Sequence, residues 1–275
     1  MIDTLATVTE NAEPAPGYRL LTLEYNEEFA AEPGQFAMLR PHGCAEPLLR
    51  RALAVYQIQS PSRSRFRLSF LYQVLGRGTQ VLSSLHPGAI VESLGPLGNR
   101  WPLPDAGRAV LVAGGIGSAS LFMLAQELLD ARIETVIFFG AASHAAAIGC
   151  GLRDFEGLGV RLAITTDDGS LGEAGFVTGP LDRYLRSTGA AGVSIYACGP
   201  WPMMAKTAQI SDSAGAPCLV SLEAPMGCGF GVCVGCVFAV KTDGPLGYGS
   251  YKRVCVDGSI FPASVVDWRV NAMSH

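Results

Sequence analysis

The stretch "RAVLVAGGIGSASLFMLAQELLDA" (residues 108–131) decides the fold class of this 275-residue chain. An apolar run ends in Gly114, Gly115 and Gly117, and a helix-like pattern of apolar residues follows. This order predicts a strand, a tight turn and a helix N-terminus, with bare backbone where a pyrophosphate could bind. The Gly-x-Gly-x-x-Gly pattern is incomplete because Ser120 stands at its third position, so an ordinary strand-to-helix turn remains the alternative.

Strands and helices continue to alternate C-terminal to this stretch. Strand-like runs cover residues 135–141, 160–169 and 193–200, and helix-like segments cover residues 176–187 and 203–215. Strands that alternate with helices predict a parallel sheet with crossover helices.

The ends of these strands carry the candidate nucleotide contacts, because open α/β sheets bind ligands at the carboxyl edge. Asp167 and Asp168 could contact a ribose or cap the turn before Gly169. Cys198 is a small thiol in a turn. After "TVIFFG" the chain reads "AASHAAA", without an acid, Arg or Lys, and this favours NADH over NADPH.

The first hundred residues have a different pattern. Short alternating runs such as "YRLLTLEY" (18–25) and "FRLSFLYQV" (66–74), broken by Gly and Pro, predict an antiparallel barrel or sandwich. Arg50, Arg51 and a tight turn at "GRGT" (76–79) could bind phosphate. Solvated arginines and a simple hairpin turn are the alternative.

Three cysteines lie close together in "GCGFGVCVGC" (227–236). Cys228, Cys233 and Cys236, with Cys255 further on, have the C-x4-C-x2-C…C spacing of plant-type [2Fe–2S] centres. The glycines between them allow the tight wrapping that such a cluster needs. Zinc prefers paired C-x2-C knuckles, of which there is one here, so zinc and unrelated thiols are the weaker alternatives. No convincing helix follows this segment.

Composition and charge argue against several classes of protein. Twenty basic against 24 acidic residues, without a basic stripe, argue against a nucleic-acid partner. The chain is 49% hydrophobic and only 16% charged, which fits a buried partner interface or a membrane. The one candidate span, residues 109–126, is too small and polar at its centre, so we expect no membrane span. The N-terminal segment has acidic residues where a signal peptide needs a basic start and an apolar core. We therefore expect a cytoplasmic protein.

The barrel pattern, "GRGT", "AGGIG", "TTDDGSLG", "YACGP" and the cysteine segment together resemble the ferredoxin-reductase superfamily. More narrowly, the chain resembles the FAD and iron–sulfur electron-transfer subunits of class 1B dihydroorotate dehydrogenase. The resemblance covers essentially the whole chain. It implies a multidomain β and α/β architecture: an antiparallel FAD-binding β-barrel (1–104), a parallel-sheet pyridine-nucleotide domain (105–215) and a small C-terminal [2Fe–2S] domain (216–275).

The resemblance also implies cofactor-binding residues. The expected FAD contacts are Arg51, Ala52, Leu53 and Ala54, then Leu71, Tyr72 and Gln73, and the phosphate turn at Gly78 and Thr79. The expected NAD contacts are Gly114, Gly115 and Gly117, with Cys198, Gly199 and Pro200 beside the nicotinamide. Two residues depart from the family's Arg-Pro-x-Ser segment: Ala52 replaces Pro, and Ala54 replaces the hydroxyl residue that faces the flavin.

What the resemblance implies about function is electron transfer in pyrimidine biosynthesis. A separate FMN-containing catalytic subunit oxidises dihydroorotate, and this oxidoreductase subunit passes the electrons through [2Fe–2S] and FAD to NAD. The usual assembly is a heterotetramer of two plus two subunits. No general acid or base is expected. The alternatives are a related reductase subunit serving ferredoxin, sulfide or hydrogenase chemistry, and a non-catalytic partner-binding subunit.

Overall fold

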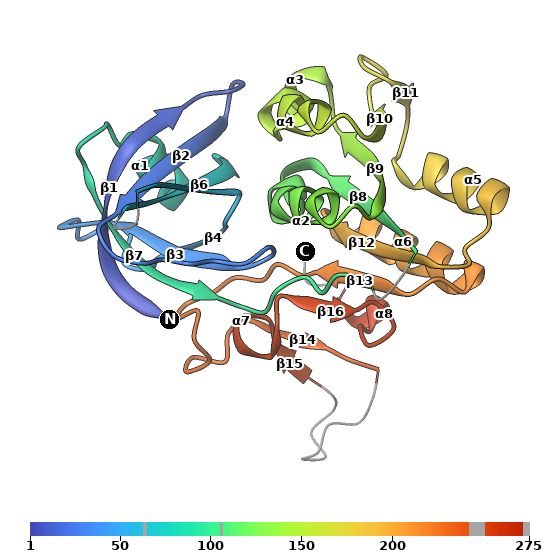
Figure 1. Ribbon diagram of the computed structural model, residues 1–275. Coiled ribbons are helices and arrows are strands. Elements are labelled where there is room, and N and C mark those ends of the chain that lie inside the picture. The colour runs from blue at the N-terminus through green and yellow to red at the C-terminus, as the bar shows by residue number, and fades with distance from the viewer. Residues whose placement is uncertain (63–64, 105–106, 242–250, 272–275) are drawn as a thin grey trace.

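Two seven-stranded sheets and a two-stranded sheet organise the protein, which we describe from a computed structural model covering residues 1–62, 65–104, 107–241 and 251–271. In Figure 1 the N-terminal sheet lies on the left, the second sheet with its helices lies on the right, and the C-terminal segment lies below both. The predicted combination of antiparallel β and parallel α/β parts is confirmed.

The N-terminal sheet is antiparallel and curled, with strand order β4-β3-β7-β1-β2-β6-β5. Its strands are β1 (Ile2–Ala12), β2 (Tyr18–Tyr25), β3 (Phe36–Pro41), β4 (Arg51–Ala54), β5 (Gln57–Ser62), β6 (Arg65–Gln73) and β7 (Ile90–Leu97). The two edge strands β4 and β5 are joined by Val55 and Tyr56, whose N–H groups donate to the Gln35 and Ser69 carbonyls. This continuity brings the two edges together, as in a barrel.

Two features of the N-terminal sheet were not predicted from the sequence. β1 lies in the middle of the sheet, but its fully buried side chains are only Ala6 and Val8, so its sequence pattern is weak. The "GRGT" segment does not form a hairpin turn; it begins the helix α1 (Arg77–Ser83). The Thr79 hydroxyl accepts hydrogen bonds from the N–H groups of Leu75 and Gly76, which caps the helix.

The second sheet has the strand order β11-β10-β9-β8-β12-β13-β16. Its strands are β8 (Arg108–Gly114), β9 (Glu134–Ala141), β10 (Arg161–Thr166), β11 (Glu173–Ala174), β12 (Val193–Cys198), β13 (Cys218–Ser221) and β16 (Ile260–Pro262). All pair in parallel except β16, which is antiparallel to β13. The segment after residue 215 therefore supplies two strands to the sheet of the nucleotide domain.

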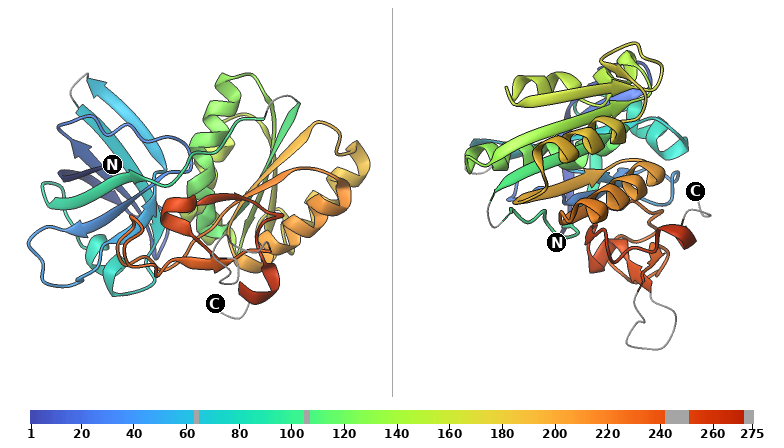
Figure 2. Two further views of the ribbon diagram at one scale, coloured as in Figure 1. Left: turned by 90° about the horizontal axis from the view of Figure 1, so that it is seen from below. Right: turned by 90° about the vertical axis from the view of Figure 1, so that its right-hand side faces the viewer.

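Helices cover both faces of the second sheet (Figure 2). The helices α2 (Ser118–Asp130), α3 (His144–Gly149) and α4 (Leu152–Gly157) lie on the side of the barrel, and α5 (Thr178–Thr188) and α6 (Trp201–Ala214) lie on the other. Along β8, Leu111 packs toward the first face while Val110 and Val112 pack toward the second. α3 and α4 were not expected, because each spans only six residues and ends at a glycine.

The C-terminal segment contains β14 (Val237–Ala239), β15 (Tyr251–Arg253), α7 (Val254–Asp257) and α8 (Trp268–Asn271). Among the described residues of this segment, the expectation of no helix was wrong for α7 and α8, two single turns that are too short to produce a periodic pattern. The Asn99 side chain joins this segment to the barrel through hydrogen bonds with the backbone of Ser259 and Ile260. Within the described residues, no helix is long and apolar enough to cross a membrane.

Candidate functional site

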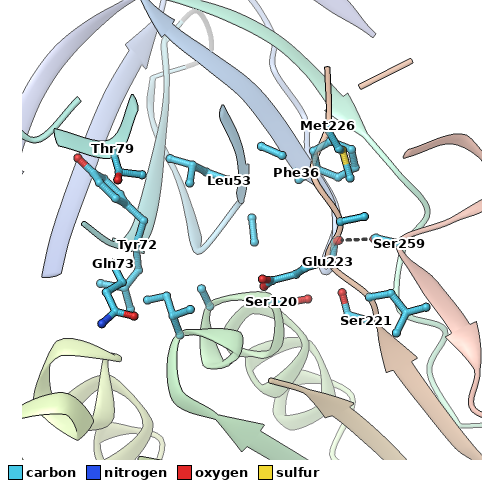
Figure 3. Close-up of a pocket in the computed structure, with 18 of the residues that line it drawn as sticks. Phe36, Leu53, Tyr72, Gln73, Thr79, Ser120, Ser221, Glu223, Met226 and Ser259 are labelled. Atoms are coloured by element: carbon cyan, nitrogen blue, oxygen red, sulfur yellow. Dashed lines mark hydrogen bonds between the residues drawn. The ribbon is translucent and has the colours of Figure 1, made fainter. Parts of the chain in front are cut away.

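A cavity of about 410 Å³ lies between the barrel and the α/β sheet (Figure 3). Seven of the residues expected to contact FAD line it: Ala52, Leu53, Ala54, Leu71, Tyr72, Gln73 and Thr79. They come from β4, β6 and the start of α1, which are far apart in sequence but adjacent because the sheet curls. We call this space the first cavity.

Arg51 and Gly78 do not line the first cavity but support its edge. A side chain on Gly78 would collide with the Arg51 guanidinium, so glycine lets this cation pack against the first turn of α1. The guanidinium also donates to the backbone carbonyls of Leu49 and Arg50. A positive charge and a helix N-terminus therefore lie beside Thr79, an arrangement suited to phosphate.

The opposite wall of the first cavity was missed at the sequence level. It comes from α2 and from the segment after β13, and includes Ser120, Ser221, Glu223 and Met226. Figure 3 shows the Glu223 carboxyl group pointing into the cavity from this side. The available signal was the position of "SLEA" at the carboxyl end of a parallel strand, where ligand-binding residues concentrate.

The environment of this wall stabilises the neutral, protonated forms of Glu223 and Cys198. Burial between the two domains raises the pKa of Glu223, which lines the open cavity. Burial also raises the pKa of Cys198, and the nearby Glu223 charge adds to that shift. Cys198 is fully buried behind the wall and lines neither this cavity nor the next.

The first cavity fits a flavin dinucleotide. Its walls are largely apolar, with Leu53, Leu71 and Tyr72 on the barrel side. The Tyr72 hydroxyl and the Ser120 hydroxyl are buried and have no hydrogen-bond partner among the described residues. Such polar atoms cost free energy unless a ligand satisfies them.

A second cavity, of about 420 Å³, lies at the carboxyl edge of the parallel sheet. Gly114, Gly115 and Pro200 line it, as expected for nucleotide contacts. Gly117, Cys198 and Gly199 lie behind its lining: a side chain on Gly117 would collide with the backbone of the other two. These three residues bring two strand ends together and do not line the cavity.

The paired aspartates after β10 separate into two roles. The Asp168 carboxylate accepts hydrogen bonds from the N–H (2.9 Å) and hydroxyl (2.6 Å) of Ser170, so it caps the turn. Asp167 lines the second cavity, together with Phe176 and Lys206. Asp167 was one of the two candidate ribose contacts, whereas Phe176 and Lys206 were not among the expected nucleotide contacts.

The four expected metal ligands gather in the C-terminal segment as two pairs. The Sγ atoms of Cys236 and Cys255 are 3.2 Å apart. The Cys228 sulfur accepts the Cys233 N–H at 3.4 Å, and the Cys233 sulfur accepts the Gly235 N–H at 3.4 Å. Among the described residues, no three His, Cys, Asp or Glu side chains converge on a single point. Two pairs match two irons better than one tetrahedral zinc ion.

The loop that carries these cysteines is shaped to stabilise thiolates. Partial burial raises the pKa of Cys228, but backbone N–H groups, including that of Cys233, outweigh it and lower the value to about 6. The backbone takes positive φ at Gly229, Gly231 and the non-glycine Val234. Such N–H···S contacts are the usual surroundings of an iron–sulfur cluster, so the donor set fits one.

Comparison with known proteins agrees with this geometry. A family model described as the iron–sulfur cluster binding domain of dihydroorotate dehydrogenase B matches residues 223–267. The electron transfer subunit of dihydroorotate dehydrogenase B (NAD(+)) from Desulforamulus reducens is 37% identical, covering 86% of this chain and 87% of the relative. The subunit of the same name from Geobacillus thermodenitrificans is 40% identical, with 86% of each chain covered.

Solved structures support the same fold. A chain from the structure of an NADH-dependent reduced ferredoxin-NADP oxidoreductase, reported for flavin-based electron bifurcation, has a TM-score of 0.82 and is 29% identical. The match covers 98% of this chain and 92% of that one. A ferredoxin reductase of carbazole 1,9a-dioxygenase shares the fold with a TM-score of 0.67 over 78% of this chain and 67% of its own, at 20% identity.

Proposed function

The chain belongs to the family of electron transfer subunits of dihydroorotate dehydrogenase B, and from this premise we propose that it passes electrons through [2Fe–2S] and FAD to NAD. It is an oxidoreductase component, and its family name associates it with pyrimidine biosynthesis. The observation that carries the proposal is the contiguity of the three sites. The segment after β13 lines the first cavity up to Met226 and reaches Cys228 two residues later, and the turn that begins α2 lines both cavities.

The first cavity would hold FAD. Leu53, Leu71 and Tyr72 would pack against the ring system, and Thr79 and the N-terminus of α1 would bind phosphate, with Arg51 supplying charge. When bound, FAD supplies the chemistry that links a hydride exchange with NAD to single-electron exchange with the cluster. Ala52 and Ala54 offer no side-chain hydrogen bond, so the polar contacts must come from the backbone and from the opposite wall, where Ser120 and Glu223 lie.

The cysteines would hold the cluster as two pairs. Cys228 and Cys233 would bind one iron, and Cys236 and Cys255 the other, which agrees with their contacts. The N–H groups around them would stabilise negative charge on sulfur and so raise the reduction potential.

The second cavity would hold NAD. Gly114 and Gly115 would let the pyrophosphate approach the backbone, and Pro200 would lie at the nicotinamide end. Gly117, Cys198 and Gly199 would act indirectly, by shaping the two turns that carry these contacts.

The partner we propose is an FMN-containing catalytic subunit, in an assembly of two plus two chains. The cysteine loop itself carries exposed apolar side chains: Phe230, Val232 and Val234 are 45%, 73% and 54% exposed. Such a patch next to a redox centre suits a protein interface. We place the complex in the cytoplasm, where reducing conditions keep cysteine thiols free to bind iron.

A cysteine substitution tests the proposed route. We expect Cys233→Ser to lose bound iron and the cluster absorbance but to retain FAD that NADH can reduce. Electron transfer from dihydroorotate, through the catalytic subunit, should fall at least about 100-fold because the cluster lies on its path. Cys44→Ser is the matched control, since Cys44 is exposed and far from the loop in sequence, and it should behave like the wild type. Full transfer in Cys233→Ser would contradict the proposal.

A second candidate is a reductase subunit that serves ferredoxin, which the structural similarity over 98% of the chain favours. The protein that co-purifies from the native host decides between them. An FMN-containing, dihydroorotate-oxidising subunit supports the first proposal, whereas a ferredoxin-dependent enzyme supports the second.

A further inference from the structure

The tip of the cysteine loop is too small to hold a protein partner by itself. A stable protein–protein interface buries about 800 Å² on each side, from about 20–30 residues. The loop offers the exposed apolar side chains of Phe230, Val232 and Val234. The remaining contact area must therefore come from surface that adjoins the loop.

The loop adjoins the barrel at the outer face of its sheet. A Cβ atom on Gly229 would collide with the Met38 side chain, so the loop lies directly on β3, and in Figure 1 it lies below β3 and β7. Met38 belongs to the apolar cluster that includes Cys255, whereas the adjacent Ala37 and Leu39 point into the barrel core. The loop therefore covers the first part of the outer face and leaves the rest of it open.

The strand register determines what lies next on this outer face. Residues that pair across adjacent strands point to the same side of a sheet, so the row through Met38 crosses β3, β7 and β1. The next row lies two residues further along the strands, about 7 Å away. It consists of Arg40, Glu92 and Leu5, and Ile90 lies in the row after it. A partner that covers the loop tip meets these rows next.

Apolar side chains are exposed on these rows. Leu5 is 51% exposed and Ile90 is 37% exposed. Leu48, whose carbonyl accepts a hydrogen bond from Arg40 at 3.0 Å, is 75% exposed. The solvent face of an antiparallel sheet is normally polar, and neighbouring apolar groups on it mark an interaction site. We call Leu5, Leu48 and Ile90 the barrel patch.

The charged residues beside the barrel patch are already paired. The Arg40 guanidinium lies 2.6 Å from the Glu92 carboxylate. Arg50 lies 3.4 Å from Glu92 and 2.8 Å from Asp3. Two carboxylates thus face two guanidinium groups. A partner surface that covers this network leaves no uncompensated charge behind, which is the costly case in a buried interface.

We propose that the barrel patch is the second half of the docking surface for the FMN-containing catalytic subunit, which binds across the patch and the cysteine loop together. The matching surface of the partner is apolar. The proposal rests on the proposed function and adds the surface that holds the partner. Because the barrel also forms one wall of the first cavity, this contact fixes the distances between the partner's redox centre, the cluster and FAD.

Binding measurements with the purified catalytic subunit test the barrel patch. Leu5→Arg and Leu48→Arg each place an unpaired cation in the proposed interface, so each should weaken the complex at least about 30-fold in calorimetric titrations. The milder double variant, Leu5→Ala with Leu48→Ala, should weaken it about tenfold.

Val270→Arg is the matched control and should bind the catalytic subunit as the wild type does. Val270 is also apolar and exposed, but it lies on α8, away from the barrel in Figure 1. The isolated variants should keep the wild-type melting temperature, FAD and iron content, and reduction of FAD by NADH, because Leu5, Leu48 and Val270 line neither the first nor the second cavity.

The outcomes separate the docking surface from the function. If the catalytic subunit binds the wild type and the Leu5 and Leu48 variants equally well, the barrel patch is not part of the interface and the proposed function stands. If these variants instead abolish self-association of the isolated subunit in sedimentation and leave the complex intact, the patch joins copies of this chain and the docking proposal is wrong. If no FMN-containing, dihydroorotate-oxidising subunit binds the wild type, the proposed function itself is wrong.

Discussion

Glu223 shows how a single residue acquires its chemistry from position. It lies in a segment with no other charge nearby in sequence, faces the first cavity, and has its pKa raised by burial. A protonated carboxyl group can donate a hydrogen bond, which no side chain at Ala54 can do. The wall opposite the barrel therefore offers the polar contact that the barrel segment lacks.

The raised pKa of Glu223 makes stability depend on pH. The folded state binds this proton more tightly than the unfolded state, so ionisation destabilises the protein as pH rises above the unfolded value toward the folded pKa. We expect Glu223→Gln to unfold at a higher temperature than the wild type at pH 8, with the difference shrinking toward pH 4.5. Glu27→Gln, at an exposed glutamate, is the control. A difference independent of pH in thermal scans would contradict this account.

At the scale of elements, two strand-to-helix turns are packed on each other at the carboxyl edge of the sheet. The turn between β8 and α2 contains Gly117, and the turn between β12 and α6 contains Cys198 and Gly199. A Cβ atom on Gly117 would lie about 2.5 Å from the backbone of the latter turn, closer than any real contact. The glycine is needed there because the two turns approach so closely.

Gly117→Ala should therefore separate the two turns. We expect a loss of about 1–3 kcal/mol in the free energy of unfolding, the usual cost of overpacking, together with weaker NADH binding. Denaturant unfolding and nucleotide titration measure the two effects. Gly157→Ala is the matched control, because a Cβ atom at Gly157 meets no atom within 4 Å. Equal stability of the two variants would refute the role given to Gly117.

At the scale of the whole molecule, the cysteine loop lies against the barrel while its tip remains open. Gly229, at φ 84°, packs against Met38 and Leu97. Phe230, Val232 and Val234 project outward as an apolar surface. The cysteine loop is thus supported by the barrel on one side and exposed on the other, as an electron-transfer contact requires.

This arrangement predicts a change that occurs only in the complex. Amide hydrogen exchange in residues 227–234 should slow about tenfold or more when the FMN-containing subunit binds, because the interface excludes water. Residues 144–149 of α3, which lie on the α/β domain, serve as an internal reference and should not change. Protection of the loop that is the same in the isolated subunit and in the complex would argue against this surface as the interface.

Local sequence patterns determined the element types and one set of candidate ligands. The apolar runs that become β8, β9 and β12 are buried on both faces, so their pattern is strong. The C-x4-C-x2-C spacing marks the cysteines without any knowledge of the fold, because those ligands share one short loop. β1, α3 and α4 were not predicted from the sequence, because they are short or weakly apolar and lack a long periodic signal.

The tertiary structure decided which side chains face the cavities. Glu223 and Ser120 reach the first cavity from segments about 100 residues apart, and Asp167 reaches the end of β9 from β10 through one backbone hydrogen bond. Sequence spacing carries no information about such meetings, since they depend on strand order and on how the sheet curls. The sequence alone therefore determined the modules and the cluster loop, whose signals are local. Only the packing of the modules distinguished Asp167 from Asp168 and cavity-lining glycines from those behind the lining, because those differences arise between distant segments.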